Sequence, residues 1–286
     1  MSLTNTDPKK TRYFPKFDWP RIHNPAVQFP LTEKNINKVA MEERQALAQA
    51  RQYFETFRDD IACIILEPIQ GEGGDNHFRM EFHKGLRELA DEYEALLIYD
   101  EVQTGVGLTG KFWAHEHYVK PDILAFGKKA QVCGILASKR IDDIETNCFH
   151  VSSRINSTWG GNLVDMVRFD RILEVIEEDD LVSHASHTGE YLLDTIKKIA
   201  ENEEHFSNPR GKGLLCAIDM PDTHTRNAVL KECVKNGLMI LGCGTRTIRF
   251  RPPLTVHKEH IDQGLDILIR SYKAAMEECP ALKNGK

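Results

Sequence analysis

The feature that most constrains the fold of this chain is a series of short, largely apolar runs interrupted by an amphipathic segment. The apolar runs occupy residues 61–66, 96–99, 122–126 and 133–137. Residues 78–94, between the first two runs, repeat apolar side chains at the spacing of a helix. Buried strands that alternate with a helix are typical of β-α-β units. The sequence therefore predicts an α/β fold, built on a sheet of parallel neighbouring strands with both faces covered.

The flanking segments predict a further helix before these runs and a smaller unit after them. Residues 1–35 are rich in Pro, Asn, Thr and aromatic residues and predict an irregular segment, whereas residues 40–58 predict a helix. The remaining expected elements are helices at 162–178 and 181–203, a strand at 213–219, a helix at 224–236, strands at 238–241 and 247–251, and a helix at 257–277. Residues 208–211 (Asn-Pro-Arg-Gly) predict a break in regular structure. We expect a large domain over residues 1–180 and a small α+β domain over residues 181–286.

Charge and cysteine content exclude several classes of protein. The 286 residues carry a formal net charge of −6, which disfavours a general electrostatic attraction to nucleic acid or to an anionic membrane. The seven cysteines include no C-x-x-C pair, so we expect reduced thiols and neither a disulfide framework nor a zinc site. The first residues lack the apolar region of a secretory signal, and no apolar run reaches membrane-spanning length. The resulting prediction is a cytoplasmic protein.

Polar residues follow three of the apolar runs directly. Glu67 comes after the first run, Asp100 and Gln103 come after the second, and Lys128 and Lys129 come after the third. The carboxyl ends of neighbouring parallel strands lie at one edge of a sheet, where α/β proteins bind their ligands. We therefore expect carboxylates, an amide and an amine to meet in one crevice.

Two short motifs suggest other chemistries. Residues 105–110, GVGLTG, have the G-x-G-x-x-G pattern of a dinucleotide-binding turn, but residues 100–103 separate them from the strand, and residues 127–131 lack the expected acid. A nicotinamide oxidoreductase is therefore disfavoured, and the glycines predict a tight backbone turn. The sequence His115-Glu116-His117 has no third ligand at a recognisable spacing, so we expect a solvated helix face and no metal site.

An Asp and a Lys at neighbouring strand ends form a known chemical pair. A lysine amine can attach pyridoxal phosphate as a Schiff base, while a carboxylate faces the protonated pyridine nitrogen. Each residue also has an ordinary structural interpretation, because an Asp after a strand often caps a turn and a Lys-Lys pair is often solvated surface. From spacing alone, both interpretations remain open.

Five motifs occur in order along the chain. They are LEPIQGEGG at 66–74, YDEVQTGVGLTG at 99–110, PDILAFGKK at 121–129, STWGGN at 157–162 and IRFRPPL at 248–254. Together they resemble the class III (ω-) aminotransferases, pyridoxal-phosphate enzymes of fold type I. Within this family, GKKAQVCG and SRINSTWGGN are most similar to the L-lysine 6-transaminase (lysine ε-aminotransferase) subgroup. The resemblance implies an aspartate aminotransferase-like large domain, incomplete at its N-terminus, and a small C-terminal α+β domain.

The resemblance also implies which residues hold the cofactor, pyridoxal 5′-phosphate. Lys128 corresponds to the lysine that attaches it, with Lys129 as the alternative. Asp100 corresponds to the aspartate on the pyridine nitrogen, and Gln103 to the glutamine on the ring oxygen. The other cofactor-binding residues implied by the same motifs are Val102, Ser157 and Thr158. In the family, the threonine matched by Thr158 reaches the cofactor phosphate of the neighbouring subunit, which implies a homodimer.

For the substrates, the resemblance implies Arg249, Glu72 and Asn156. Arg249 corresponds to the arginine that binds a substrate carboxylate, and Glu72 to the glutamate that neutralises this arginine while lysine is bound. The implied reaction moves the terminal amino group of L-lysine to 2-oxoglutarate, giving glutamate and 2-aminoadipate 6-semialdehyde. Ornithine, 4-aminobutyrate and diaminobutyrate also present a terminal amine and remain alternative donors.

The resemblance begins within the family's sequence. The family's phosphate-binding loop, the aromatic residue that stacks on the pyridine ring and an F-H-G-R substrate motif have no counterpart in residues 1–60. We therefore expect either a transaminase or a truncated, non-catalytic fragment or subunit of one.

Overall fold

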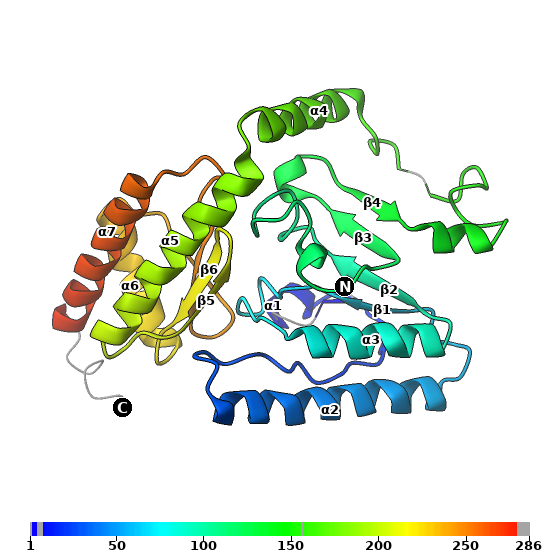
Figure 1. Cartoon of the computed structure of the whole chain (residues 1–286), viewed down its shortest axis with the longest axis horizontal. Helices are drawn as coiled ribbons and strands as arrows, with labels where there is room; N and C mark the ends of the chain where they lie inside the picture. The colour runs from blue at the N-terminus through cyan, green and yellow to red at the C-terminus, as the bar shows by residue number, and fades with distance from the viewer. Residues whose placement is uncertain (1, 5–7, 156, 279–286) are drawn as a thin grey trace.

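The computed structural model describes residues 2–4, 8–155 and 157–278 (Figure 1). The helices are α1 (Pro8–Thr11), α2 (Glu33–Thr56), α3 (Met80–Glu92), α4 (Leu163–Glu178), α5 (Leu181–Asn202), α6 (Thr223–Lys235) and α7 (Lys258–Glu278), with short 3-10 turns η1 (Ala114–His117), η2 (Lys128–Ala130) and η3 (Lys139–Asp143). The strands are β1 (Cys63–Leu66), β2 (Leu96–Asp100), β3 (Ile123–Phe126), β4 (Gly134–Ala137), β5 (Ser207–Lys212), β6 (Leu215–Asp219), β7 (Leu241–Cys243) and β8 (Thr247–Phe250). No helix in these ranges is both long and apolar enough to cross a membrane.

The first sheet has the strand order β1-β2-β3-β4. Strands β1, β2 and β3 are parallel, as the sequence predicts, whereas β4 pairs antiparallel with β3. Helix α3 packs against β1 and β2, and α2 packs against α3 (Figure 1). Phe82 and Leu86 of α3 form a buried cluster with Leu97 and Tyr99 of β2.

The prediction that both faces of this sheet are covered is wrong for the described residues. Side chains alternate between the faces of a strand, and helices α2 and α3 lie in layers on the same side. On the opposite face, Ile65 of β1 and Ile135 of β4 are 39% and 42% exposed. Part of the apolar surface of the first sheet therefore faces outward.

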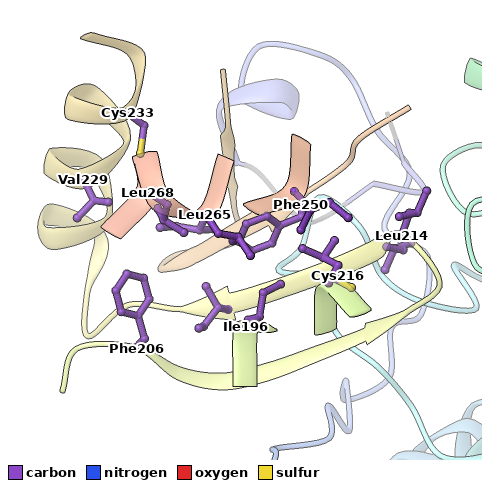
Figure 2. Packing of buried hydrophobic residues seen from close by; sticks show 14 of the residues in the cluster. Ile196, Phe206, Leu214, Cys216, Val229, Cys233, Phe250, Leu265 and Leu268 are labelled. Carbon is purple, nitrogen blue, oxygen red and sulfur yellow. The ribbon is translucent and has the colours of Figure 1, made fainter. Parts of the chain in front are cut away.

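The second sheet has the order β5-β6-β8-β7, and all its pairings are antiparallel. Every residue of β6 is buried. Side chains of α5, α6 and α7, among them Ile196, Val229 and Leu268, pack with Cys216 of β6 and Phe250 of β8 into one cluster (Figure 2). This second sheet and its helices contain the largest cluster of buried hydrophobic residues in the described part of the chain.

The predicted break at residues 208–211 is wrong, because these residues belong to strand β5. Pro209 lacks a backbone donor and Asn208 has a φ of 52°, features typical of turns. Both are tolerated here because β5 is an edge strand and its register shifts between Ser207 and Arg210. Smaller differences are that α2 begins at Glu33 and β7 at Leu241, and that α1 interrupts the segment expected to be irregular.

Candidate active site

The carboxyl ends of β1, β2 and β3 bring Glu67, Asp100 and Lys128 to one edge of the first sheet. Leu66 pairs with Tyr99, so that the next residues, Glu67 and Asp100, are neighbours where the strands end. Burial and the charge of Asp100 raise the pKa of Glu67, the backbone N–H of Gly71 and the charge of Lys128 lower it, and the resulting pKa is about 7. These interactions place an amine and two carboxyl groups close together.

The two adjacent lysines have different surroundings. Lys129 donates from Nζ to the backbone oxygen of Gln103 at 3.1 Å, and burial, together with the charges of Arg251 and Lys128, lowers its pKa to about 7. Lys128 is exposed and has a φ of 37°. The lower pKa of Lys129 would suit a nucleophile, but its amine is directed toward the Gln103 carbonyl. The lysine whose charge acts on the Glu67 carboxyl group at the strand ends is Lys128.

The turn after β2 is fixed by short contacts. The backbone N–H of Val102 donates to Oδ1 of Asp100 at 3.0 Å. A Cβ atom at Gly127 would lie 3.4 Å from Val102 and 3.1 Å from Sγ of Cys133. Val102 therefore packs beside Gly127, the residue that precedes Lys128, and its backbone contacts Asp100.

Arg249 of β8 and Glu72, which follows β1, form an ion pair across the two sheets. Arg249 Nη1 lies 3.0 Å from Oε2 of Glu72, and Lys10 Nζ of α1 lies 3.1 Å from Oε1. Burial acts to raise the pKa of Glu72, but the hydrogen bonds and charges of Lys10 and Arg249 outweigh it, so the pKa is lowered. The glutamate is therefore held as a carboxylate between two cations.

The structure does not bring Ser157 and Thr158 to this edge. Both are exposed, and the Ser157 carbonyl accepts from Gly160 N at 3.2 Å within a local turn. Among the described residues, no hydrogen bond or ion pair joins them to Asp100 or Lys128. Asn156 lies outside the described residues.

The glycines of GVGLTG and the two histidines of His115-Glu116-His117 form hydrogen bonds with other groups of the chain. The backbone N–H groups of Gly105, Gly107 and Gly110 donate to the carbonyls of Glu101, Phe112 and Gly107. His115 Nδ1 lies 3.0 Å from Glu101 Oε1, whereas His117 Nε2 faces the Thr109 carbonyl at 3.0 Å. The glycine amides are thus already paired, and the two histidines have separate partners.

Sequence reasoning missed two residues that border this edge. Arg251 donates from Nη2 to Oδ1 of Asp75 and, at 3.3 Å, to Oε1 of Gln103. Asp75 is completely buried. The sequence contained a signal for Arg251. It stands two positions after Arg249 in an extended pattern, and residues at this spacing point to the same face of a strand, so both arginines were candidates for the site.

With this geometry established, comparison with known proteins identifies the family. Residues 1–271 match the family described as aminotransferase class-III. The chain is 52% identical to the L-lysine-epsilon aminotransferase of Amycolatopsis lactamdurans, over 95% of this chain and 61% of that protein. It is 37% identical to the 4-aminobutyrate aminotransferase of Emericella nidulans, over 97% of this chain and 54% of that protein. The solved lysine aminotransferase from M. tuberculosis superposes with a TM-score of 0.92 at 50% identity, over 96% of this chain and 63% of that one.

The chain therefore belongs to the class III aminotransferases. The predicted fold class is confirmed, because the chain shares the fold type I architecture of the lysine aminotransferase. The predicted cofactor is confirmed for the family, whose members depend on pyridoxal 5′-phosphate. The chain spans about three-fifths of the length of the lysine aminotransferases that it matches.

The residues at the sheet edge fit this cofactor. Lys128 offers an amine and Asp100 a carboxylate. Within the described part of the chain, the Gln103 side-chain nitrogen donates no hydrogen bond, while the side-chain oxygen accepts from Arg251. The Lys128 amine thus suits attack on a carbonyl carbon, the Asp100 carboxylate can accept from a protonated ring nitrogen, and the Gln103 N–H can donate to an ionised ring oxygen.

Proposed function

We propose that this chain carries the cofactor-attachment and substrate-carboxylate groups of a pyridoxal-phosphate-dependent aminotransferase. The observation that carries the proposal is that the charges of Lys128 and Asp100 both act on Glu67 at the carboxyl ends of parallel strands. When bound, pyridoxal 5′-phosphate supplies a carbonyl carbon for amine transfer and a ring that accepts electrons. Lys128 provides the attaching amine and moves protons at the reacting carbon. Asp100 keeps the ring nitrogen protonated, Val102 packs beside the ring, and Gln103 binds the ring oxygen.

For the substrates, we propose transfer of the terminal amino group of L-lysine to 2-oxoglutarate, giving glutamate and 2-aminoadipate 6-semialdehyde. The 52% identity to an L-lysine-epsilon aminotransferase supports this choice over 4-aminobutyrate, ornithine or diaminobutyrate. Arg249 binds the substrate carboxylate, and Glu72 neutralises Arg249 until a dicarboxylate arrives. Asn156 is proposed as a further substrate contact.

The assembly proposed for this function is a cytoplasmic homodimer. Ser157 and Thr158 lie on an exposed turn, which suits residues that serve the neighbouring subunit's phosphate site. The free state of the described cysteines supports a reducing compartment. We also propose the division into a large domain at 1–180 and a small domain at 181–286.

A second candidate is a non-catalytic fragment or subunit of such an enzyme. The observation that favours it is that the chain spans 61% of a lysine aminotransferase. The two candidates differ in whether the purified chain binds the cofactor covalently.

The test is to add pyridoxal phosphate to the purified chain, record its absorbance, reduce with borohydride and map the labelled peptide. We expect a shifted absorbance band and a label on Lys128. Lys128→Ala should abolish the band, and the matched variant Lys129→Ala should retain it. A label on Lys129 would refute the assignment of the lysine. No band in the unaltered chain would favour the non-catalytic candidate.

A further inference from the structure

Gln103 is held at two points by cations from different parts of the chain. Lys129 Nζ donates to its backbone oxygen at 3.1 Å, and Arg251 Nη2 donates to its side-chain oxygen at 3.3 Å. A guanidinium has only N–H donors, so the amide atom that faces Arg251 must be the oxygen. The amide nitrogen of Gln103 must then point away from Arg251.

Arg251 directly follows β8 and is itself fixed against the second sheet. Its Nη1 donates to the carbonyl of Phe250 at 2.8 Å and to that of Cys216 at 3.4 Å. Its Nη2 also donates to the completely buried carboxylate of Asp75. The backbone N–H of Asp75 donates in turn to the Gly71 carbonyl at 2.9 Å. The donor that faces Gln103 is therefore held in place by several contacts before any ligand binds.

The loop after β1 presses against the same side of the amide. A Cβ atom at Gly71 would lie 2.3 Å from the Gln103 side-chain oxygen and 3.2 Å from its nitrogen. A methyl group at this position would therefore force the Gln103 amide to shift. The contact with Arg251 and the packing of Gly71 thus constrain the same group independently.

We infer that Arg251 is a positioning residue that orients the Gln103 amide so that its N–H donates to the ring oxygen of the cofactor. The inference deepens the proposed function and rests on it. A hydrogen bond donated to an ionised oxygen favours its ionised form. A carbonyl turned toward that oxygen would instead repel it. Arg251, which directly follows β8 of the second sheet, thereby controls a contact made at the edge of the first sheet.

The first part of the test needs no cofactor. The side-chain amide signals of Gln103 are recorded in a ¹H–¹⁵N spectrum of the full chain and assigned by their loss in Gln103→Glu. We expect Arg251→Met to shift these signals, and the matched variant Arg246→Met, at a half-exposed arginine of the same sheet region, to leave them unchanged. Unchanged signals in Arg251→Met would overturn the inference.

The second part follows the absorbance of the chain with pyridoxal phosphate as the pH is varied. We expect Arg251→Met to raise the apparent pKa of the cofactor band by about one pH unit, because losing a hydrogen bond to a charged group changes an equilibrium roughly tenfold. Arg251→Lys retains a donor, so its apparent pKa should lie between that of the unaltered chain and that of Arg251→Met. An unchanged apparent pKa alongside shifted amide signals would overturn the donation to the ring oxygen. Absence of any band in the unaltered chain would overturn the proposed function and this donation together, while the amide signals would still decide the Arg251 contact.

A second variant covers the case in which Arg251→Met does not fold. Gly71→Ala crowds the Gln103 oxygen without removing a charge, and its control Gly73→Ala places a methyl group 2.4 Å from the Gln70 side chain instead. We expect Gly71→Ala, and not Gly73→Ala, to shift the Gln103 amide signals and to raise the apparent pKa of the band. Equal effects of the two variants would contradict the inference.

Discussion

The two sheets of this molecule differ in how completely they are packed. The second sheet has a fully buried central strand, β6, enclosed in the largest apolar cluster of the described residues. The first sheet is packed by α3 on one face, while Ile65 and Ile135 are partly exposed on the other. The residues proposed for catalysis lie mainly on the first sheet. The comparison suggests that stability resides mostly in the second sheet and chemistry at the edge of the first.

The largest expected effect comes from Arg210, which joins the two sheets. Its guanidinium contacts the carbonyls of Gly74 and Asp75 beside the first sheet and the carboxylate of Asp219 on β6, at 2.6 to 2.8 Å. Arg210→Ala leaves a buried carboxylate and two carbonyls without this partner, so we expect a loss of roughly 3–5 kcal/mol in the free energy of unfolding. This loss is measured by unfolding both the variant and the unaltered chain in urea, with circular dichroism as the signal.

The control for Arg210 is Arg246, which lies near the same carboxylate. It lies 3.7 Å from Oδ2 of Asp219, and its side chain is 45% exposed. Exposed pairs contribute little, so Arg246→Ala should cost less than about 1 kcal/mol. Equal losses in the two variants would show that the buried connection between the sheets is not what stabilises the molecule.

A somewhat smaller effect should separate a buried position over the second sheet from an exposed position on the last strand of the first sheet. Leu268 of α7 is completely buried, whereas Leu136 of β4 is 46% exposed. Truncating a buried leucine leaves a cavity and typically costs about 3 kcal/mol, whereas an exposed position changes the free energy of unfolding by about 0.5 kcal/mol or less. Leu268→Ala and Leu136→Ala remove the same atoms, and their unfolding midpoints in urea can be compared. Similar losses would contradict the difference in packing.

The sequence predicted the features that depend on local pattern. Apolar periodicity located β1, β2, β3 and α3 to within a few residues, because burial of one face is recorded in the spacing of side chains. It did not predict β5, since Pro209 and Asn208 are signals of a turn and only pairing with β6 holds them in a strand. The sequence also did not predict that β4 runs antiparallel to β3, because strand direction depends on pairing and not on the local pattern.

The candidate site was predictable where residues follow strands directly. Asp100 and Lys128 lie at one edge because neighbouring parallel strands end there, which the apolar runs already indicated. The Arg249–Glu72 pair followed only from the resemblance. The contact of Arg251 with Gln103 joins residues 148 positions apart, and no local pattern records which side chains meet across such a separation.

The smallest predicted effect concerns Glu67 at the edge of the first sheet. Burial raises its pKa from 4.5 to about 7 in the folded chain. The folded state therefore binds more protons than the unfolded state between these values, and this group's contribution to stability is lost as the pH rises from about 4.5 to about 7. With screening by solvent at the strand ends, we expect a change on the order of 1 kcal/mol across this window.

Other groups titrate in the same range with the opposite sign, so the difference between two variants is the informative quantity. Burial lowers the pKa values of His77 and His83, which makes stability rise with pH near 6.5. These contributions cancel when the unfolding free energy of Glu67→Gln is subtracted from that of the unaltered chain. The difference should decline as the pH rises from 5 to 8, while the same subtraction for Glu88→Gln, at an exposed position of α3, should remain flat. A flat difference for Glu67 would mean that the edge of the first sheet is well solvated, and that its carboxyl groups do not share the restricted environment that the proposed chemistry requires.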